Sequence, residues 1–265
     1  MPSLLICGEF LKNLMETKSI LLTGASGKLG QSIINSKLFD HLLTPSRDEL
    51  DITNTESVRK YFNKNKFEMI IHCAALARMV LCEQNPSLAI RTNIIGTSNL
   101  VNHLYENKLE SKVRVVHIST DGVYQGTDGN YSEQDPTIPY NIYGLTKLAA
   151  EFPVSVLPNH VIIRTRFFDP ADARFNDYAD DIYTSKIPIS DLVEAIKTLS
   201  ISDYIGVINV GDKKMSEYER HKLYQPQIIK SSYEKIQSQS KVKLAKDASM
   251  NISLWERIKN EKKKH

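Results

Sequence analysis

A glycine-spaced segment near the start of the chain constrains the fold more than any other feature. The segment Gly24-Ala25-Ser26-Gly27-Lys28-Leu29-Gly30 follows the short apolar run 19–23 and opens a helical pattern. Glycines at this spacing allow a tight turn, a close approach of the backbone to a pyrophosphate, and close packing of a helix on a strand. Backbone N–H groups at the helix start would face the phosphates. The segment predicts a dinucleotide-binding βα turn, although such a pattern also occurs in ordinary strand–turn–helix units.

Strand-like and helix-like segments alternate from residue 19 to about residue 210. Such alternation predicts a parallel sheet covered by helices on both faces, and right-handed crossovers make it doubly wound. The chain beyond residue 211 is polar and rich in lysine. We therefore predict an α/β protein, a doubly wound parallel-sheet Rossmann fold with a small, shortened C-terminal substrate lobe. The expected parts are an N-terminal extension (1–18), a dinucleotide-binding Rossmann core (19–166), and the remaining sheet elements with a small substrate-binding lobe (167–265).

The expected elements can be placed along the chain from apolar periodicity. Strands are expected at 19–23, 41–44, 67–72, 113–118, 161–163 and 207–210, and helices at 29–38, from Asn54 to about 62, and at 86–107, 142–151 and 189–199.

Composition excludes several classes of protein. The 265 residues include 34 basic and 31 acidic side chains, a balance that does not predict nucleic-acid binding. Three cysteines without paired spacing argue against a disulfide framework or a zinc site, and no metal site is expected. No apolar run approaches about 18 residues, so neither a transmembrane helix nor a signal peptide is expected. These features predict a cytoplasmic protein without a membrane partner.

The end of the second expected strand bears on the form of the cofactor. It reads Thr44-Pro45-Ser46-Arg47-Asp48. An acid here would bind a ribose 2′-hydroxyl, and a base would accommodate a 2′-phosphate. Arg47 therefore favours NADP(H), while Asp48 keeps NAD(H) compatible. The alternative for Arg47 is an ordinary surface position in a loop.

Small side chains end the third expected strand, in the segment His72-Cys73-Ala74-Ala75. Small residues at a carboxyl end let a cofactor lie across the sheet edge. A plain buried core is the alternative for the two alanines. Arg78 lies just beyond, where an anionic substrate or a surface salt bridge would use it.

Tyr143 and Lys147 form a Y-x-x-x-K pair in the expected helix 142–151. Four residues make about one turn, so both side chains lie on one face. A nearby lysine cation lowers the pKa of a tyrosine hydroxyl, which is otherwise about 10. Tyr143 could then protonate a carbonyl oxygen as hydride arrives, with Lys147 also holding the nicotinamide ribose. Ser119 and Thr120 end the fourth expected strand and offer hydroxyls to the same oxygen.

Several segments together resemble one branch of a known family. They are Leu50-Asp51-Ile52-Thr53, Ile71 to Ala75, His117-Ile118-Ser119-Thr120-Asp121, and Asn141 to Glu151. With the glycine turn, they look like the dTDP-4-dehydrorhamnose reductase branch of the extended short-chain dehydrogenase/reductase family, over roughly residues 19–166. The resemblance implies reduction of a 4-keto nucleotide sugar with NAD(P)H. It also implies that Tyr143 is the acid, Lys147 its helper and Thr120 the hydroxyl partner.

The resemblance also assigns binding residues. It places Asp51 and Ile52 beside the adenine. The candidate cofactor-binding residues are then Gly24, Ser26, Gly27, Lys28, Leu29, Gly30, Arg47, Asp51, Ile52, Cys73, Ala74, Ala75, Tyr143 and Lys147. The candidate substrate-binding residues are Arg78, Ser119, Thr120, Arg164 and Arg166. For Arg164, a structural role is the alternative to contact with a diphosphate.

The chain departs from the family pattern in two places. Gly122 stands where the family usually has an aromatic residue, and Tyr124 could partly substitute for it. The segment between Arg166 and Pro188 is short for a sugar-binding region.

Three functions therefore stay open. The first is reduction of a keto group on a nucleotide-linked deoxysugar. The second is a related sugar-nucleotide epimerase or dehydratase that retains NAD. The third is a cofactor-binding regulatory subunit with little catalysis. A nucleotide sugar is the expected partner, and the helix pair Asn85–Asn107 with Ile142–Glu151 could form a homodimer face.

Overall fold

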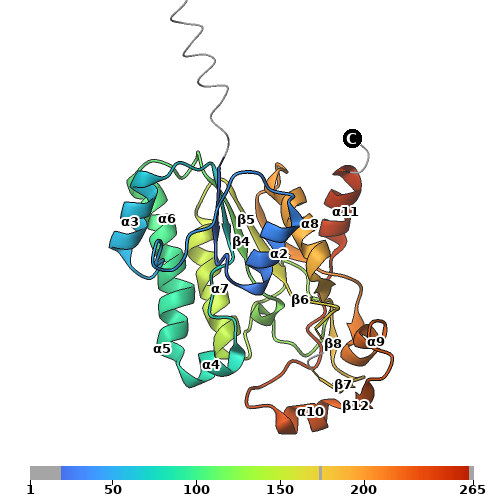
Figure 1. Cartoon of the computed structure of the whole chain (residues 1–265). Coiled ribbons are helices and arrows are strands. Elements are labelled where there is room, and N and C mark those ends of the chain that lie inside the picture. The colour runs from blue at the N-terminus through green and yellow to red at the C-terminus, as the bar shows by residue number, and fades with distance from the viewer. Residues whose placement is uncertain (1–18, 173–174, 263–265) are drawn as a thin grey trace, which may run out of the picture.

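The central feature of the structure, a computed structural model that describes residues 19–172 and 175–262, is a six-stranded parallel sheet. Its strand order is β10-β5-β4-β3-β1-β2, so the chain reverses its direction of winding between β1 and β3 (Figure 1). This confirms the predicted doubly wound fold, whereas the expected extension 1–18 lies outside the described residues. The strands are β1 (Ile20–Thr23), β2 (Leu42–Leu43), β3 (Met69–His72), β4 (Arg114–Ile118), β5 (His160–Thr165) and β10 (Gly206–Val210).

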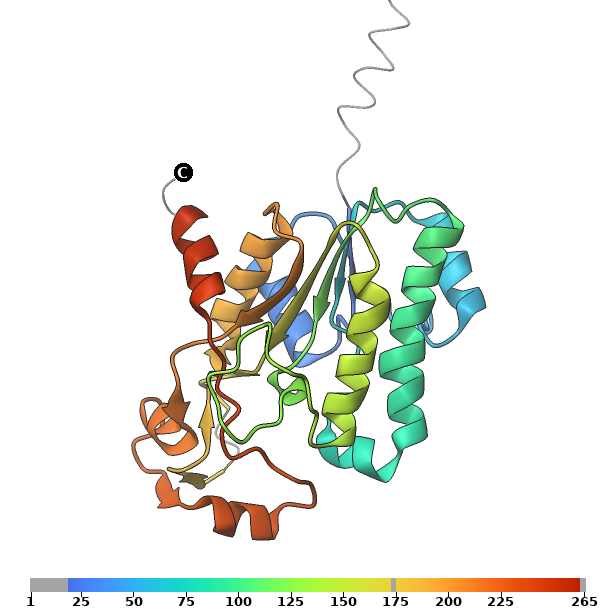
Figure 2. The ribbon, with the colours of Figure 1, turned by 180° about the vertical axis from the view of Figure 1, so that it is seen from behind.

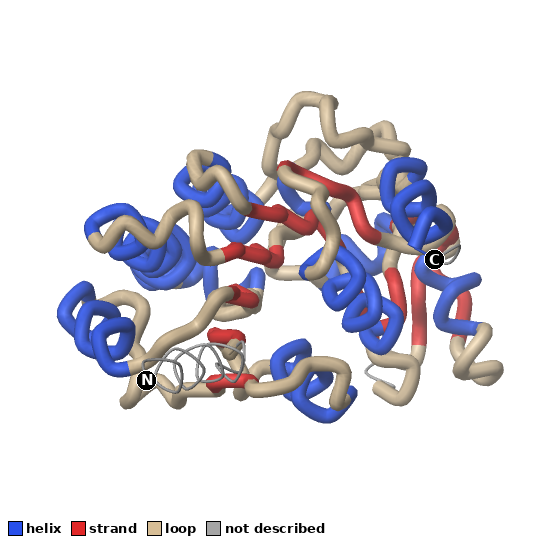
Figure 3. Tube along the Cα trace, turned by 90° about the horizontal axis from the view of Figure 1, so that it is seen from above, coloured by secondary structure: helices blue, strands red, loops and turns tan. Residues whose placement is uncertain are grey.

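Helices cover both faces of the sheet, and Figure 3 shows the strands in a row between two helical layers. The layers form because successive residues of a strand point to opposite faces. Leu21 and Ile70 belong to one buried apolar cluster, and Leu22 and Ile71 belong to the other. One layer contains α2 (Lys28–Ser36), α8 (Ile189–Ser200) and α11 (Ser253–Lys262), and the other contains α3 (Thr55–Lys64), α6 (Gly96–Glu106) and α7 (Ile142–Ser155).

The long helix expected over 86–107 is divided in the structure. It consists of α5 (Pro86–Ala89), a π-helical turn η1 (Ile90–Ile95) and α6, and α4 (Met79–Gln84) precedes it. Pro86 sits at the first helical position, and the Asn85 side chain caps the helix by accepting from Leu88 N at 3.0 Å. Figure 2 shows α6 and α7 side by side on this face. A π-turn widens the helix by one residue, and such turns are frequent at functional sites.

The C-terminal lobe (residues 167–188 and 211–250) lies at the carboxyl ends of the strands, because its two segments directly follow β5 and β10 (Figures 1 and 2). It contains three separate two-stranded pairs instead of one sheet. The pairs are β6 (Phe167–Phe168) with β9 (Ile187–Pro188), β7 (Asp177–Ala179) with β12 (Ile229–Ser231), and β8 (Tyr183–Thr184) with β11 (Met215–Ser216). Its helices are α9 (Glu217–Lys222) and α10 (Tyr233–Gln239). No helix in the described ranges is long and apolar enough to cross a membrane.

Candidate active site

A cavity of about 550 Å³ opens where the winding of the sheet reverses, at the carboxyl ends of β1, β2 and β3. In open α/β sheets, ligands bind in the crevice at this topological position. The cavity brings together most of the residues that the sequence predicts for the cofactor. They are Gly24, Ser26, Gly27, Arg47, Asp51, Ile52, Cys73, Ala74 and Ala75.

The three glycines of the turn are required for different reasons. Gly24 has φ +73°, and a Cβ there would lie 2.6 Å from Ala74 N. A Cβ on Gly30 would lie 2.4 Å from Gly24 O, because the helix packs closely on the turn. Gly27 is different, since its Cβ would meet only Gly24 O at 3.2 Å, while the residue itself lines the cavity. No side chain caps α2 at Gly27, so the start of this helix fits an anionic group bound in the cavity.

The last three residues of the turn, Lys28, Leu29 and Gly30, do not line the cavity. Leu29 is buried in the apolar cluster against α8. Lys28 Nζ lies 2.5 Å from Asp172 Oδ2 and 3.3 Å from Asp169 Oδ2, which joins the turn to the lobe. Lys28 also borders a second cavity, of about 200 Å³, with aromatic walls that include Phe168.

Charges of both signs lie at the far edge of the larger cavity. Arg47 is exposed, and its Nε lies 3.6 Å from Asp51 Oδ2. Asp51 Oδ1 accepts from Thr53 N at 2.9 Å and from the Thr53 hydroxyl at 2.8 Å. Partial burial would raise the pKa of Asp51, but the Thr53 hydrogen bonds and Arg47 together hold it below its usual value. A basic and an acidic group are therefore both available to a ribose at this edge.

Helix α7 places Tyr143 and Lys147 one turn apart. The helix starts here because the Asn141 side chain accepts from Gly144 N at 2.8 Å, and Glu83 Oε1 accepts from Ile142 N at 2.8 Å. The Tyr143 hydroxyl lies within hydrogen-bonding reach of the hydroxyl of Thr120, which follows β4.

The Thr120 hydroxyl is held from two further sides. It accepts from Gly122 N at 3.1 Å and donates to Asp121 Oδ1 at 3.2 Å. The structure thus brings together the hydroxyl groups of the two residues that the resemblance assigned to the carbonyl oxygen.

The electrostatics of Tyr143 differ from the expectation. Burial and the neighbouring Asp121 raise its pKa well above the usual value, and the hydrogen bond to Thr120 offsets this only in part. Lys147 instead lies with its Nζ 3.2 Å from His117 Nε2. Burial lowers the pKa of Lys147 to about 8, against the charges of Glu151 and Cys73. Lys147 does not itself line the cavity, but its partner His117 pairs with His72 across the sheet, so Lys147 lies near the Cys73 edge of the cavity.

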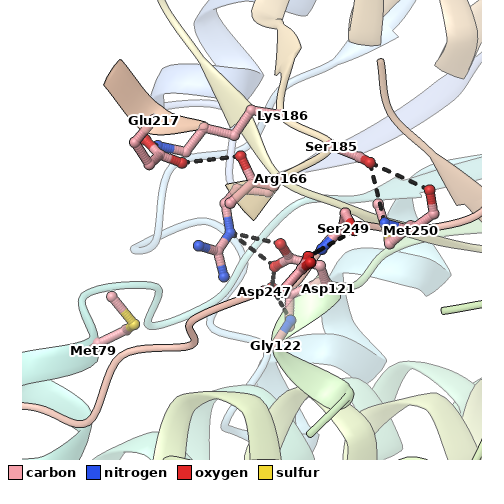
Figure 4. A network of polar contacts seen from close by, with 12 residues as sticks. Met79, Asp121, Gly122, Arg166, Ser185, Lys186, Glu217, Asp247, Ser249 and Met250 are labelled. Carbon is pink, nitrogen blue, oxygen red and sulfur yellow. Dashed lines mark hydrogen bonds and ion pairs between the residues drawn. The ribbon is translucent and has the colours of Figure 1, made fainter. Parts of the chain in front are cut away.

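Arg166 lies beside Asp121, the residue that follows Thr120 (Figure 4). Its Nε is 2.7 Å from Oδ2 of the fully buried Asp121, and its Nη2 donates to the Tyr140 hydroxyl at 3.1 Å. Burial raises the pKa of Asp121, although Arg166 draws it down. Lys186 and Glu217 form an ion pair next to this group. Arg166 stays partly exposed and so remains accessible to a ligand.

Two predicted substrate residues lie in an environment that does not fit that role. Arg164 is 5% exposed, with its Nη2 2.7 Å from Glu151 Oε2 and its Nη1 donating to the Tyr124 hydroxyl at 3.0 Å. The Ser119 hydroxyl donates to Glu151 Oε1 at 2.5 Å. This buried network satisfies the polar groups of Arg164 and favours its structural role, the alternative to contact with a diphosphate. It also engages the proton of the Ser119 hydroxyl, which was expected to face the substrate oxygen. Arg78, by contrast, is exposed at the start of α4.

Tyr124 does not replace the missing aromatic residue at position 122. Its side chain is fully buried, and its hydroxyl donates to Asn209 Oδ1 at 2.8 Å. A Cβ on Gly122 would meet Thr120 Oγ1 at 3.4 Å, an ordinary contact. The buried position therefore accepts a Cβ beside the Thr120 hydroxyl without displacing its neighbours.

Sequence reasoning missed Asn93, which sits in the π-turn and is 1% exposed. Its Oδ1 accepts from Leu76 N at 2.7 Å, and its Nδ2 donates to Thr146 Oγ1 at 2.9 Å. It therefore ties the segment after β3 to the turn of α7 that carries Lys147. A polar side chain within an apolar helical pattern was the signal that could have identified it.

Comparison with known proteins gives relatives of two kinds. The family model described as RmlD substrate binding domain matches residues 18–175. A dTDP-4-keto-6-deoxy-D-glucose reductase of Streptomyces niveus is 35% identical over 150 residues, covering 55% of this chain and 51% of the relative. Methionine adenosyltransferase 2 subunit beta of Mus musculus is 28% identical over 154 residues, covering 55% and 44%. The chain thus spans about half the length of the curated relatives it matches.

Solved structures show the same fold over nearly the whole chain. The crystal structure of dTDP-4-dehydrorhamnose reductase from Bacillus anthracis in complex with NADP has a TM-score of 0.79 at 24% identity, and the match covers 91% of this chain and 92% of that chain. The lobe, which the sequence suggests is short, therefore has counterparts through most of its length in that structure.

Proposed function

Because the chain belongs to the RmlD substrate binding domain family, we propose that it is an oxidoreductase that reduces a keto group on a nucleotide-linked deoxysugar. One arrangement carries this proposal. Thr120 and Tyr143, together with the charge of Lys147, lie at the carboxyl edge of the sheet, which also holds the cavity of the glycine turn. This puts a proton donor next to a site with the shape and polarity that suit a dinucleotide.

The residues of the cavity fit a nicotinamide dinucleotide. Gly27 and the uncapped start of α2 would hold the pyrophosphate, since no side chain fills the space there. Arg47 favours NADP(H) through a 2′-phosphate, and Asp51 keeps NAD(H) compatible. The bound cofactor supplies the hydride. The related reductase from Bacillus anthracis was solved with NADP, in line with this preference.

Tyr143 is suited to give a proton to the carbonyl oxygen of the substrate. Its raised pKa keeps the hydroxyl protonated at neutral pH, as a donor requires. The Thr120 hydroxyl lies beside the Tyr143 hydroxyl, and it would offer its proton to the same oxygen by giving up its hydrogen bond to Asp121 Oδ1. Arg166 and the exposed Arg78 are the arginines available for the substrate's phosphates.

The test is titration of the purified chain with NADPH and NADH, followed by NADPH oxidation assays with 4-keto-6-deoxy nucleotide sugars. Tyr143→Phe should lower turnover by at least about 10²-fold, the usual contribution of a general acid, while cofactor binding persists. Tyr105→Phe removes an exposed hydroxyl bonded to Val156 O at 2.6 Å and should leave turnover unchanged. Wild-type activity in Tyr143→Phe would mean that Tyr143 is not the proton donor.

A second candidate function is a cofactor-binding regulatory subunit. The similarity to methionine adenosyltransferase 2 subunit beta favours it, because that relative is named as a subunit of a larger enzyme. Cofactor binding without turnover of any sugar would favour this function. NAD that stays bound through purification would instead favour an epimerase or dehydratase.

We also retain the homodimer as a proposal. Leu145, Phe152 and Val156 expose large apolar side chains along α7, at 52%, 65% and 62%. Sedimentation should give a dimer for the wild type and a monomer for Phe152→Glu. A wild-type monomer at all concentrations would exclude it.

A further inference from the structure

A buried histidine contacts the lysine of the proposed active site from below the cavity. His117 lies on β4 and is fully buried, and its Nε2 is 3.2 Å from Lys147 Nζ. Within the described part of the chain, Lys147 makes no other side-chain hydrogen bond. The position of Nζ therefore depends on this contact. Burial of a polar imidazole in a central strand costs more free energy than burial of an aliphatic side chain.

The neighbouring His72 cannot accept a hydrogen bond from Lys147. Counting donors and acceptors shows that both of its ring nitrogens already have partners. The Thr97 hydroxyl donates to Asn93 O at 2.7 Å, so it can only accept from His72 Nε2, which lies 2.9 Å away. His72 Nδ1 then accepts from the Thr23 hydroxyl at 2.6 Å. His72 is therefore neutral with both nitrogens satisfied, and burial lowers its pKa to about 3.

The same counting gives His117 a defined tautomer. A charged lysine has only donors, so His117 Nε2 must accept and its proton must sit on Nδ1. His117 Nδ1 is buried and has no partner in the described part of the chain. An unpaired buried donor costs free energy, so this tautomer is maintained by the contact with Lys147.

We propose that His117 is a positioning residue that holds Lys147 Nζ at the Cys73 edge of the cavity before any cofactor binds. The effect of this contact on catalysis rests on the proposed function, in which Lys147 binds the nicotinamide ribose. Other titratable groups that face the pair are His72 from β3, Cys73 directly after β3, and Glu151 from α7. An acceptor for the ammonium favours the charged form of Lys147, against the burial that disfavours it.

The test compares two variants in protein labelled with ¹³C at lysine Cε, with the Lys147 signal assigned through Lys147→Arg. In His117→Gln the side-chain oxygen reaches the place of Nε2, and the titration midpoint should stay near that of the wild type. In His117→Asn the oxygen falls short, and the midpoint should drop by at least about one pH unit. Equal midpoints in wild type, Gln and Asn variants would overturn the proposal.

A second measurement needs no variant and decides the case if the substitutions prevent folding. Long-range ¹H–¹⁵N spectra of the wild type should show His117 protonated at Nδ1 at pH 7. Protonation at Nε2 under those conditions would overturn the proposal, because no acceptor would then face the lysine.

Failure of the proposed function is distinguishable from failure of this inference. Absence of turnover with every sugar would exclude the reductase function, but it would leave the expected titration of Lys147 unchanged. If turnover is found, His117→Asn should lower kcat and move the alkaline limb of the kcat profile down by about one pH unit. A loss of kcat without that movement would mean a merely structural role.

Discussion

The sheet and the C-terminal lobe are held together by different kinds of contact. Neighbouring strands of the sheet bury aliphatic side chains in two continuous clusters. The lobe buries apolar side chains too, but it also buries charged groups that pair with partners distant in sequence. Arg220 is 2% exposed and donates to Thr184 O at 3.0 Å and to Lys213 O at 2.8 Å. The comparison shows that apolar periodicity encodes the sheet, whereas specific pairing between distant polar residues encodes the lobe.

The two regions should therefore respond differently to substitution, and the largest effect is expected in the sheet layers. Leu192 is fully buried in α8, and Leu192→Ala should lower the free energy of unfolding by about 2–5 kcal/mol. The single tryptophan, Trp255, lies in the same cluster and reports the loss in urea titrations. Leu223→Ala, at an exposed position, should change stability by less than about 0.5 kcal/mol. Similar losses of stability for Leu192→Ala and Leu223→Ala would contradict the difference between the sheet layers and the lobe.

A polar substitution should destabilise the lobe alone. Arg220→Met would remove the arginine donor from the buried carbonyl oxygen of Thr184 and from the part-buried one of Lys213, at a cost of about 1–3 kcal/mol. Amide exchange should become faster in β8 and β11 and stay unchanged in β3, β4 and β5. Equal acceleration in the sheet would show that lobe and core unfold as one unit.

Acid should weaken the same lobe contacts. Burial would raise the pKa of Glu217, but Lys186, the hydrogen bond to His221 and then Arg166 hold it well below its usual value. The ionised form therefore stabilises the fold above the unfolded-state pKa of about 4.3, and this contribution is lost as pH falls below that value. Glu217→Gln should flatten the acid limb of a stability–pH curve. An unchanged acid limb would mean that another carboxylate controls it.

The smallest effect on stability is expected at the cofactor edge of the core. Arg47 is 72% exposed, so Arg47→Ala should leave the melting temperature unchanged. It should weaken NADPH binding by about tenfold, the loss of one charged hydrogen bond, and NADH binding very little. Arg59→Ala, another exposed arginine, is the control. Equal losses of affinity for NADPH and NADH would mean that Arg47 is an ordinary surface residue and does not bind a 2′-phosphate.

The sequence predicted the parts of the site that follow from local pattern. The glycine turn, the strand end at Cys73 and the one-turn spacing of Tyr143 and Lys147 all depend on nearby residues. The partners of Arg164 and Lys147 could not be predicted, because a buried ion pair and an imidazole acceptor come from elements far apart in sequence. The burial of Arg220 was missed for the same reason, since a lysine-rich segment indicates exposure unless its partners are known.

The π-turn at residues 90–95 has a consequence for how the chain can change over generations. The wide turn holds one residue more than a regular α-helix would, so a deletion that removed this residue would leave α5 and α6 facing their neighbours as before. The cost of the deletion would fall on Asn93, whose side chain should no longer reach both Leu76 and Thr146 from a regular turn. Selection on the contacts of Asn93, and not on the packing of the helix, should therefore preserve this turn in descendants of the protein.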